Sequence, residues 1–63
     1  MLVQAIDNTG RVVVGTLGPF GVLDEWVRLT DVTHSIDPRK PWEQSDTTEP
    51  EVLVRAETVE SLD

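Results

Sequence analysis

The chain has 63 residues, of which 12 are acidic and five are basic, for a formal net charge of −7. A chain this short forms a single domain and buries only about 60% of the surface that it exposes when unfolded, so its core needs support. It contains no cysteine and one histidine, His34, which excludes disulfides and the usual structural zinc site of four nitrogen or sulfur ligands. Oligomerisation is therefore the expected additional source of stability.

The acidic balance also bears on partners and location. A net negative surface disfavours polyanions, because phosphate binding needs a basic footprint. Two explanations stay open: an ordinary acidic surface that keeps a small protein soluble, or a halophilic cytoplasm in which high salt screens the repulsion. Residues 1–6 contain neither a basic stretch nor a long apolar run, so we expect no signal peptide and no membrane span, and a cytoplasmic protein.

The first part of the chain predicts a β-hairpin. Residues 2–6 and 11–17 are predicted strands, because the second is rich in β-branched side chains and the Asn-Thr-Gly between them suits a turn. Gly15 lies inside the second strand, where a glycine usually marks a bulge or a sharp bend. The run Gly18-Pro19-Phe20-Gly21 predicts a turn that ends this strand.

The remaining pattern predicts three more strands. Alternation over 22–36 favours a long third strand over a helical turn across 24–29. Residues 34–50 are polar and punctuated by proline, which predicts a variable loop between strands 3 and 4. Short strands are expected at 51–55 and 59–62. The predicted fold is all-β: one domain over residues 1–63, a small, five-stranded, strongly bent SH3-like barrel.

Two motifs, in this order, resemble the Sm-like (LSm/Hfq) family. The first is GRVVVGTL at residues 10–17, followed by Phe20 and by Val27-x-Leu29, and the second is LVRAETV at residues 53–59. Together they cover nearly all of the chain outside the predicted loop. The resemblance implies the Sm-like fold, here in a short divergent member without the N-terminal helix typical of the family. A different SH3-like barrel is the alternative.

The resemblance further implies a homo-oligomeric ring of six or seven subunits, in which the fourth strand of one subunit pairs with the fifth strand of its neighbour. An exposed apolar strand edge is an aggregation hazard, and a closed ring removes it. The residues expected at this interface are Val52, Leu53, Val54, Val59 and Leu62.

Family members bind uridine-rich single-stranded RNA at the inner rim of the ring, and the resemblance implies the same here. The expected RNA-binding residues are Phe20, Gly21, Glu25, Trp26, Arg55 and Ala56. Arg55 matches the arginine of the family motif. The alternative to RNA contact by Arg55 is a surface salt bridge to Glu57 or Asp24. Where the family usually carries a base-reading Asp and Asn, this chain has Gly21 and Glu25 or Trp26. The base-reading pair is therefore predicted to be lost.

The three aromatic side chains have competing interpretations. Trp26 can stack a nucleobase, or it can lie in the core or at a subunit interface. Phe20, beside the predicted turn, is expected in the core more than at a contact. Trp42 lies next to the basic pair Arg39 and Lys40, which indicates either a knob for a protein partner or a loop side chain folded back over the barrel.

The sequence gives no reason to expect an enzyme. His34 has no second histidine and no cysteine with which to form a nucleophile and base, so no catalytic residue, metal site or cofactor is predicted. Three hypotheses follow: an RNA-binding ring, a protein-interaction or scaffold ring that does not bind RNA, and an SH3-like accessory module that docks through the loop of Trp42.

Overall fold

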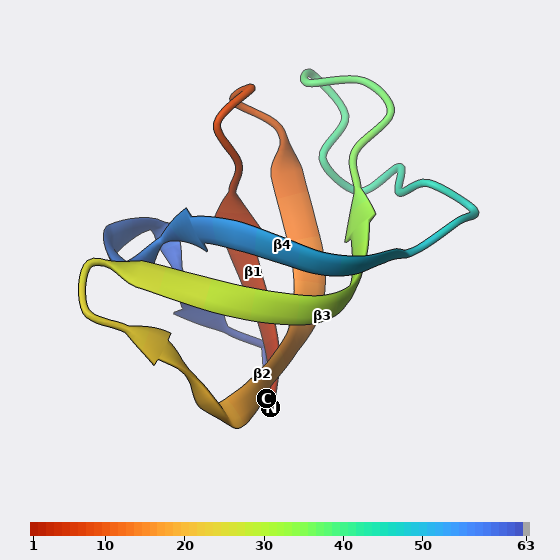
Figure 1. Cartoon of the computed structure of the whole chain (residues 1–63). Coiled ribbons are helices and arrows are strands. Elements are labelled where there is room, and N and C mark those ends of the chain that lie inside the picture. The colour runs from red at the N-terminus through yellow and green to blue at the C-terminus, as the bar shows by residue number, and fades with distance from the viewer. Residues whose placement is uncertain (63) are drawn as a thin grey trace.

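The computed structural model describes residues 1–62 as one five-stranded antiparallel sheet with a single turn of 3-10 helix (Figure 1). The elements are β1 (Leu2–Ile6), β2 (Val12–Leu23), β3 (Trp26–His34), β4 (Glu49–Arg55), η1 (Ala56–Thr58) and β5 (Glu60–Ser61). The strands lie in the order β4-β3-β2-β1-β5. Strong curvature brings β4 across the sheet into contact with β1. The prediction of an all-β, five-stranded, bent sheet is confirmed.

β1 and β2 form the predicted hairpin, with Leu2 opposite Thr16 and Ile6 opposite Val12. Their turn is organised by Asp7, whose carboxylate accepts hydrogen bonds from the N–H groups of Thr9 and Arg11, both at 2.9 Å. The Thr9 hydroxyl donates a third bond at 2.6 Å. Gly10 adopts a φ of 83°, which an L side chain rarely adopts. The predicted use of Asn-Thr-Gly as a turn is therefore correct.

Replacement of Asp7 tests this turn. Partial burial would raise the pKa of its carboxyl, but hydrogen bonds from Thr9 and Arg11 and the charge of Arg11 outweigh burial and lower the pKa from 3.8. We expect Asp7→Ala to reduce the free energy of unfolding by about 1 kcal/mol at neutral pH, and Asp7→Asn, which keeps an acceptor, by less.

The effect should depend on pH. Because the pKa of Asp7 is lower in the folded chain than in the unfolded one, its contribution is complete above pH 3.8 and is lost as the pH falls through the folded-state value. Urea unfolding of both variants and the wild type at neutral and acidic pH measures this. A gap between Asp7→Ala and the wild type that does not narrow in acid would contradict the assignment.

The second strand is longer than predicted. β2 runs through Gly18-Pro19-Phe20-Gly21 and ends at Leu23, so the predicted turn is wrong and residues 22 and 23 belong to β2 rather than β3. Between the pairs Leu17↔Leu29 and Val22↔Val27, four residues of β2 face one residue of β3. The four residues bulge out of the ladder, which accommodates a proline without an N–H inside a strand. The chain reverses instead at Asp24, where φ is 65°.

A second irregularity lies at Gly15, as predicted. The register of β2 and β3 shifts between the pairs Val14↔Thr33 and Thr16↔Thr30. A Cβ at Gly15 would lie 2.8 Å from Val32 Cγ2 and 3.1 Å from Leu29 Cβ, so only glycine allows β3 to approach this closely. The two register shifts bend the sheet strongly enough to enclose a core.

The core consists of side chains from the concave face of the sheet. The buried hydrophobic residues are Val3, Ala5, Val13, Val27, Leu29, Val32 and Val54. Burial alternates along β3 and β4, as expected for a sheet with one covered face. Val54, predicted at the subunit interface, is 1% exposed and belongs to this core, because its register partner Val27 also faces inward. Its side chain therefore does not face a neighbouring subunit.

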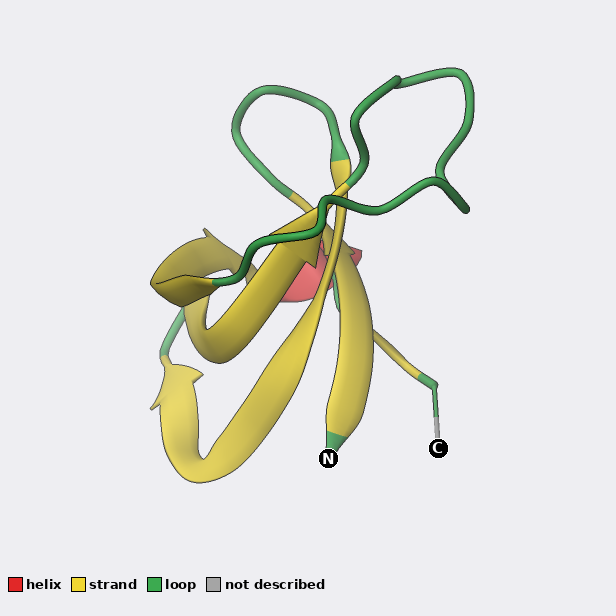
Figure 2. Ribbon diagram, turned by 90° about the vertical axis from the view of Figure 1, so that its right-hand side faces the viewer, coloured by secondary structure: helices red, strands yellow, loops and turns green. Residues whose placement is uncertain are grey.

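The predicted loop is slightly shorter than expected, because His34 ends β3 and Glu49 and Pro50 begin β4. The loop, residues 35–48, and the β1–β2 turn project from the same end of the sheet (Figure 2). The β2–β3 turn and η1 lie at the left of Figure 1, away from the loop. Within residues 1–62, no helix has the length and apolar character needed to cross a membrane.

Candidate functional site at the Arg55 corner

The β2–β3 turn and the end of β4 meet at one corner of the sheet. The pairing of β3 with β4 sets Trp26 opposite Arg55. Just beyond this pair, the Ala56 N–H donates to the Glu25 carbonyl oxygen at 2.9 Å, which fixes η1 against the turn. Side chains from two distant parts of the sequence are thereby placed together.

The Arg55 guanidinium has two contacts at this corner. Its Cζ lies 4.7 Å from the centroid of the Trp26 ring, within cation–π distance. Its Nη1 is 3.9 Å from Glu25 Oε2. The surface ion pair considered for Arg55 therefore exists, with Glu25 as the partner rather than Glu57 or Asp24. Arg55 is about half exposed and Trp26 is 40% exposed, so both can reach a ligand.

Next to the guanidinium is an open cleft of about 300 Å³, lined by Glu25, Arg55, Ala56 and Glu57. Two carboxylates and one guanidinium give this cleft a net negative character, which disfavours phosphate groups. Planar rings that can stack on the Arg55 and Trp26 pair, and polar groups that can hydrogen-bond to carboxylate or guanidinium, suit it better.

Four of the six predicted RNA-binding residues, Glu25, Trp26, Arg55 and Ala56, meet at this corner. The other two do not line the cleft. Gly21 is buried, and a Cβ there would meet Leu17 and the Arg28 carbonyl oxygen, so its function is in packing. Phe20 is 81% exposed in the β2 bulge, which makes its expected place in the core wrong. The bulge turns this side chain outward.

The predicted interface residues lie along the two edges of the sheet, which are formed by β4 and β5. Leu53 and Leu62 are about half exposed, whereas Val52 and Val59 are partly buried against the core. Val54, as described above, is in the core. The strands expected to pair between subunits are thus the edge strands of this sheet.

A larger pocket, of about 470 Å³, opens at the other end of the sheet, and its residues were not predicted as a site. Its lining consists of Asp7, Asn8, Thr9, Arg11, Val13, Val32, His34, Glu49 and Val52. These residues come from three separate segments, 7–13, 32–34 and 49–52, and no sequence motif links them. Within residues 1–62, no group of three or more His, Cys, Asp or Glu side chains is placed to hold a metal ion.

Comparisons of the chain with protein-family models, curated proteins and solved structures find no match.

Proposed function

We propose that this chain is a non-enzymatic, Sm-like module that assembles into a homo-oligomeric ring of six or seven subunits and binds single-stranded, uridine-rich RNA at the Arg55 corner. The proposal combines the resemblance of residues 10–17 and 53–59 with the arrangement of the sheet. The protein acts in the cytoplasm and recognises the RNA mainly through base stacking.

The edges of the sheet support the assembly part of the proposal. With β4 and β5 at opposite edges, a neighbour's β5 can extend the sheet beyond β4, and the same contact repeats around a ring. The Ala56 N–H points toward β3, and alternation along an antiparallel strand then turns the N–H groups of Arg55 and Leu53 toward the open edge. These donors, together with half-exposed Leu53, suit addition of a strand.

One observation carries the RNA part of the proposal: Arg55 of the second motif lies over the ring of Trp26, which follows the first motif. An aromatic ring and a guanidinium plane stacked at a surface form a platform on which a base can add. The lost Asp and Asn predict weak discrimination among bases, since stacking accepts any base.

Substitutions at the platform test this function. We expect Trp26→Ala to weaken binding of a uridine-rich oligonucleotide by about 5- to 150-fold, the usual effect of removing a stacked aromatic side chain. Arg55→Gln should weaken it about fivefold or more, because it removes a charged hydrogen-bond donor. Fluorescence anisotropy with a labelled oligonucleotide measures both, and circular dichroism checks the fold.

The matched control is Arg39→Gln, which removes the same charge from a side chain in the loop that is 91% exposed. It should leave RNA affinity unchanged. Equal losses for Arg39→Gln and Arg55→Gln would show that net charge, rather than the Arg55 corner, determines binding.

A second candidate function, a protein-interaction ring that does not bind RNA, has an observation in its favour. Glu25 and Glu57 line the cleft beside Arg55, and Glu25 is already paired with it. A carboxylate that pairs with the guanidinium competes with a phosphate or a base for the same donors. Wild-type protein that forms rings but does not bind the oligonucleotide at any salt concentration would overturn the RNA part of the proposal and favour this second function.

A further inference from the structure

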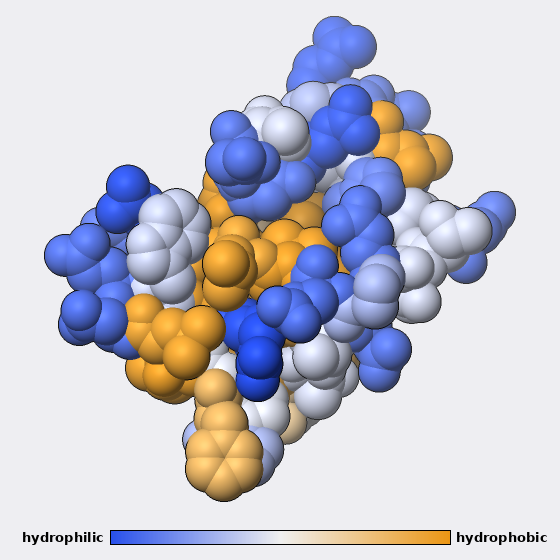
Figure 3. All heavy atoms as spheres, viewed as in Figure 1, coloured by the Kyte–Doolittle hydropathy of each residue, from blue (hydrophilic) through white to orange (hydrophobic). Residues whose placement is uncertain are grey.

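The outer face of β3 and β4 carries large apolar side chains that the fold leaves uncovered. Trp26 and Arg28 of β3 and Leu53 of β4 lie on this face, because they alternate with the buried residues Val27 and Leu29. Arg28 is directly opposite Leu53 in the ladder. Figure 3 shows hydrophobic side chains gathered in the middle of this face, with hydrophilic ones around them.

Two residues of β2 extend this surface. Leu23 pairs with Trp26 and is 47% exposed, and Phe20 protrudes from the bulge that faces Arg28. We call Phe20, Leu23, Trp26, Arg28 and Leu53 the outer patch. Exposed large apolar side chains gathered on one face are typical of an interaction surface.

The charge of the outer patch specifies the chemistry of its partner. The protein as a whole carries a net charge of −7, but Arg28 lies within the patch. Of the charged residues on the outer face of β4, Arg55 is paired with Glu25, and Glu51 lies beyond Leu53, opposite Thr30. Within residues 1–62, Arg28 takes part in no salt bridge. An apolar surface that contains an unpaired guanidinium favours an apolar side chain accompanied by a carboxylate.

The loop of residues 35–48 presents such a group. Trp42 is 73% exposed, so it is not folded back over the barrel. The loop around it is held by hydrogen bonds from Glu43 N–H to the Lys40 carbonyl oxygen (3.0 Å) and from Ile36 N–H to the Glu43 carbonyl oxygen (3.0 Å). The Gln44 side-chain amide donates to the Pro41 carbonyl oxygen at 2.6 Å. A loop already ordered in this way loses little entropy when Trp42 is buried by a partner.

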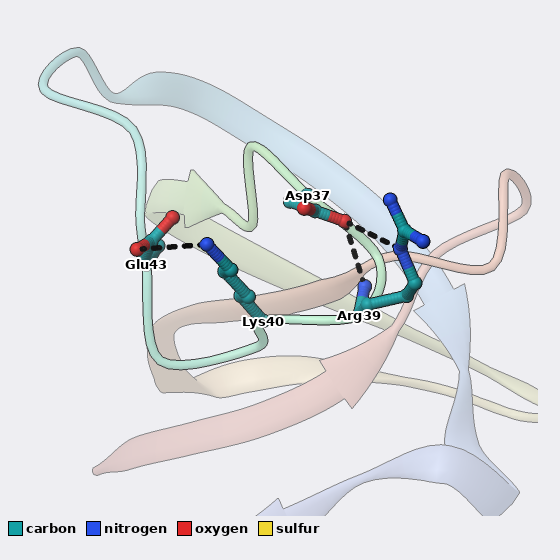
Figure 4. A network of polar contacts seen from close by, with 4 residues as sticks. All are labelled: Asp37, Arg39, Lys40 and Glu43. Carbon is teal, nitrogen blue, oxygen red and sulfur yellow. Dashed lines mark hydrogen bonds and ion pairs between the residues drawn. The ribbon is translucent and has the colours of Figure 1, made fainter.

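The basic residues of this loop are paired within it, as Figure 4 shows. Arg39 Nε lies 3.7 Å from Asp37 Oδ1, and Lys40 Nζ lies 4.0 Å from Glu43 Oε1. Asp46 takes part in no salt bridge in the described chain. The loop therefore presents an aromatic side chain with an excess carboxylate, which complements the outer patch in both apolar character and charge.

We propose that the Trp42 loop of one copy of this protein docks on the outer patch of a second copy, with Trp42 against the apolar side chains and Asp46 toward Arg28. The two surfaces lie on different parts of the molecule, since the loop extends to the right in Figure 1 while the patch covers the front of β3 and β4. The contact is head-to-tail and is made by side chains of the outer face, not by the backbone groups along the open edge of β4. It therefore joins one ring to another, or single chains if no ring forms.

Complementation between two variants tests the proposal. Trp42→Ser removes the exposed aromatic side chain of the loop and keeps the patch, whereas Leu23→Asp disables the patch, keeps the loop and leaves β4 unchanged. We expect sedimentation velocity of the wild type to show mass that grows with concentration beyond one ring, and each variant alone to lose that growth. An equimolar mixture of the two variants should associate again, because the loop of one variant can dock on the patch of the other. Association should stop at that pair, since neither variant has both an intact loop and an intact patch. Growth that persists in Trp42→Ser, or a mixture that does not associate, would overturn the proposal.

Charge reversal provides a second test that leaves the apolar residues in place. Arg28→Glu should abolish the association, and adding Asp46→Arg should restore it. The control Arg11→Glu changes the net charge equally at a residue outside both surfaces and should have no effect. A failure of Asp46→Arg to restore association would overturn the assigned pairing.

Sedimentation distinguishes a failure of the docking from a failure of the proposed ring. If the ring exists and the docking does not, both wild type and Trp42→Ser sediment as one ring at every concentration. If docking exists without a ring, the wild type forms concentration-dependent chains of single subunits, and Trp42→Ser is a monomer.

Discussion

Gly21→Ala is expected to lower the free energy of unfolding by about 1–3 kcal/mol, the usual cost of forcing extra volume into a packed site. The new Cβ would lie 2.6 Å from Leu17 Cδ1 and 2.8 Å from the Arg28 carbonyl oxygen. Leu17 can rotate, but the carbonyl belongs to the backbone of β3. A 63-residue domain has a total stability of only about 3–9 kcal/mol, so the loss is a large share.

Gly18→Ala is the matched control, because a Cβ at Gly18 meets no atom within 4 Å and its backbone does not need glycine. We expect this variant to be neutral, or up to about 1 kcal/mol more stable, since alanine restricts the unfolded chain. Urea unfolding of the two variants and the wild type makes the comparison. Equal stability of both variants would contradict the close approach of the bulge to β3.

RNA binding is expected to strengthen as salt rises, by about tenfold or more between about 0.1 M and 2 M KCl. Most nucleic-acid-binding proteins show the opposite, because salt competes with their phosphate contacts. Here the long-range charge is repulsive, with 12 acidic residues against five basic ones, while stacking on Trp26 and Arg55 is short-range. Screening removes the repulsion and leaves the stacking.

Anisotropy titrations of the oligonucleotide at several salt concentrations measure this slope. Trp26→Ala serves as the control, since it should lower affinity at every concentration without changing the sign of the slope. A wild-type affinity that falls steeply with salt would show that phosphate contacts dominate, and would contradict the stacking account.

Strand positions were predictable where local chemistry decides them. β1, the Asp7 turn and the bend at Gly15 follow from alternation, turn residues and an internal glycine. The end of β2 was not predictable in this way. Gly18-Pro19-Phe20-Gly21 has the composition of a turn, but the ladder resumes beyond it, and the actual reversal uses Asp24 in a left-handed conformation without a glycine to signal it.

The candidate site, like the strands, was predicted only in part. The motifs placed Arg55 and Trp26 in one site, and the register of β3 and β4 brings them into contact. The pairing of Arg55 with Glu25 and the outward turn of Phe20 depend on the tertiary arrangement of the turn and the bulge. Val54 is buried because its side chain lies on the inner face of β4. The short apolar run of residues 52–54 does not reveal which of its side chains face the core.

Mass by light scattering, at low and at molar salt and with and without a uridine-rich oligonucleotide, decides whether the chain forms rings that bind RNA. We expect particles built from six- or seven-subunit rings that gain the mass of the oligonucleotide, most completely at molar salt. A monomer in every condition would contradict the ring, and rings that never gain mass would contradict RNA binding and leave the protein-interaction function.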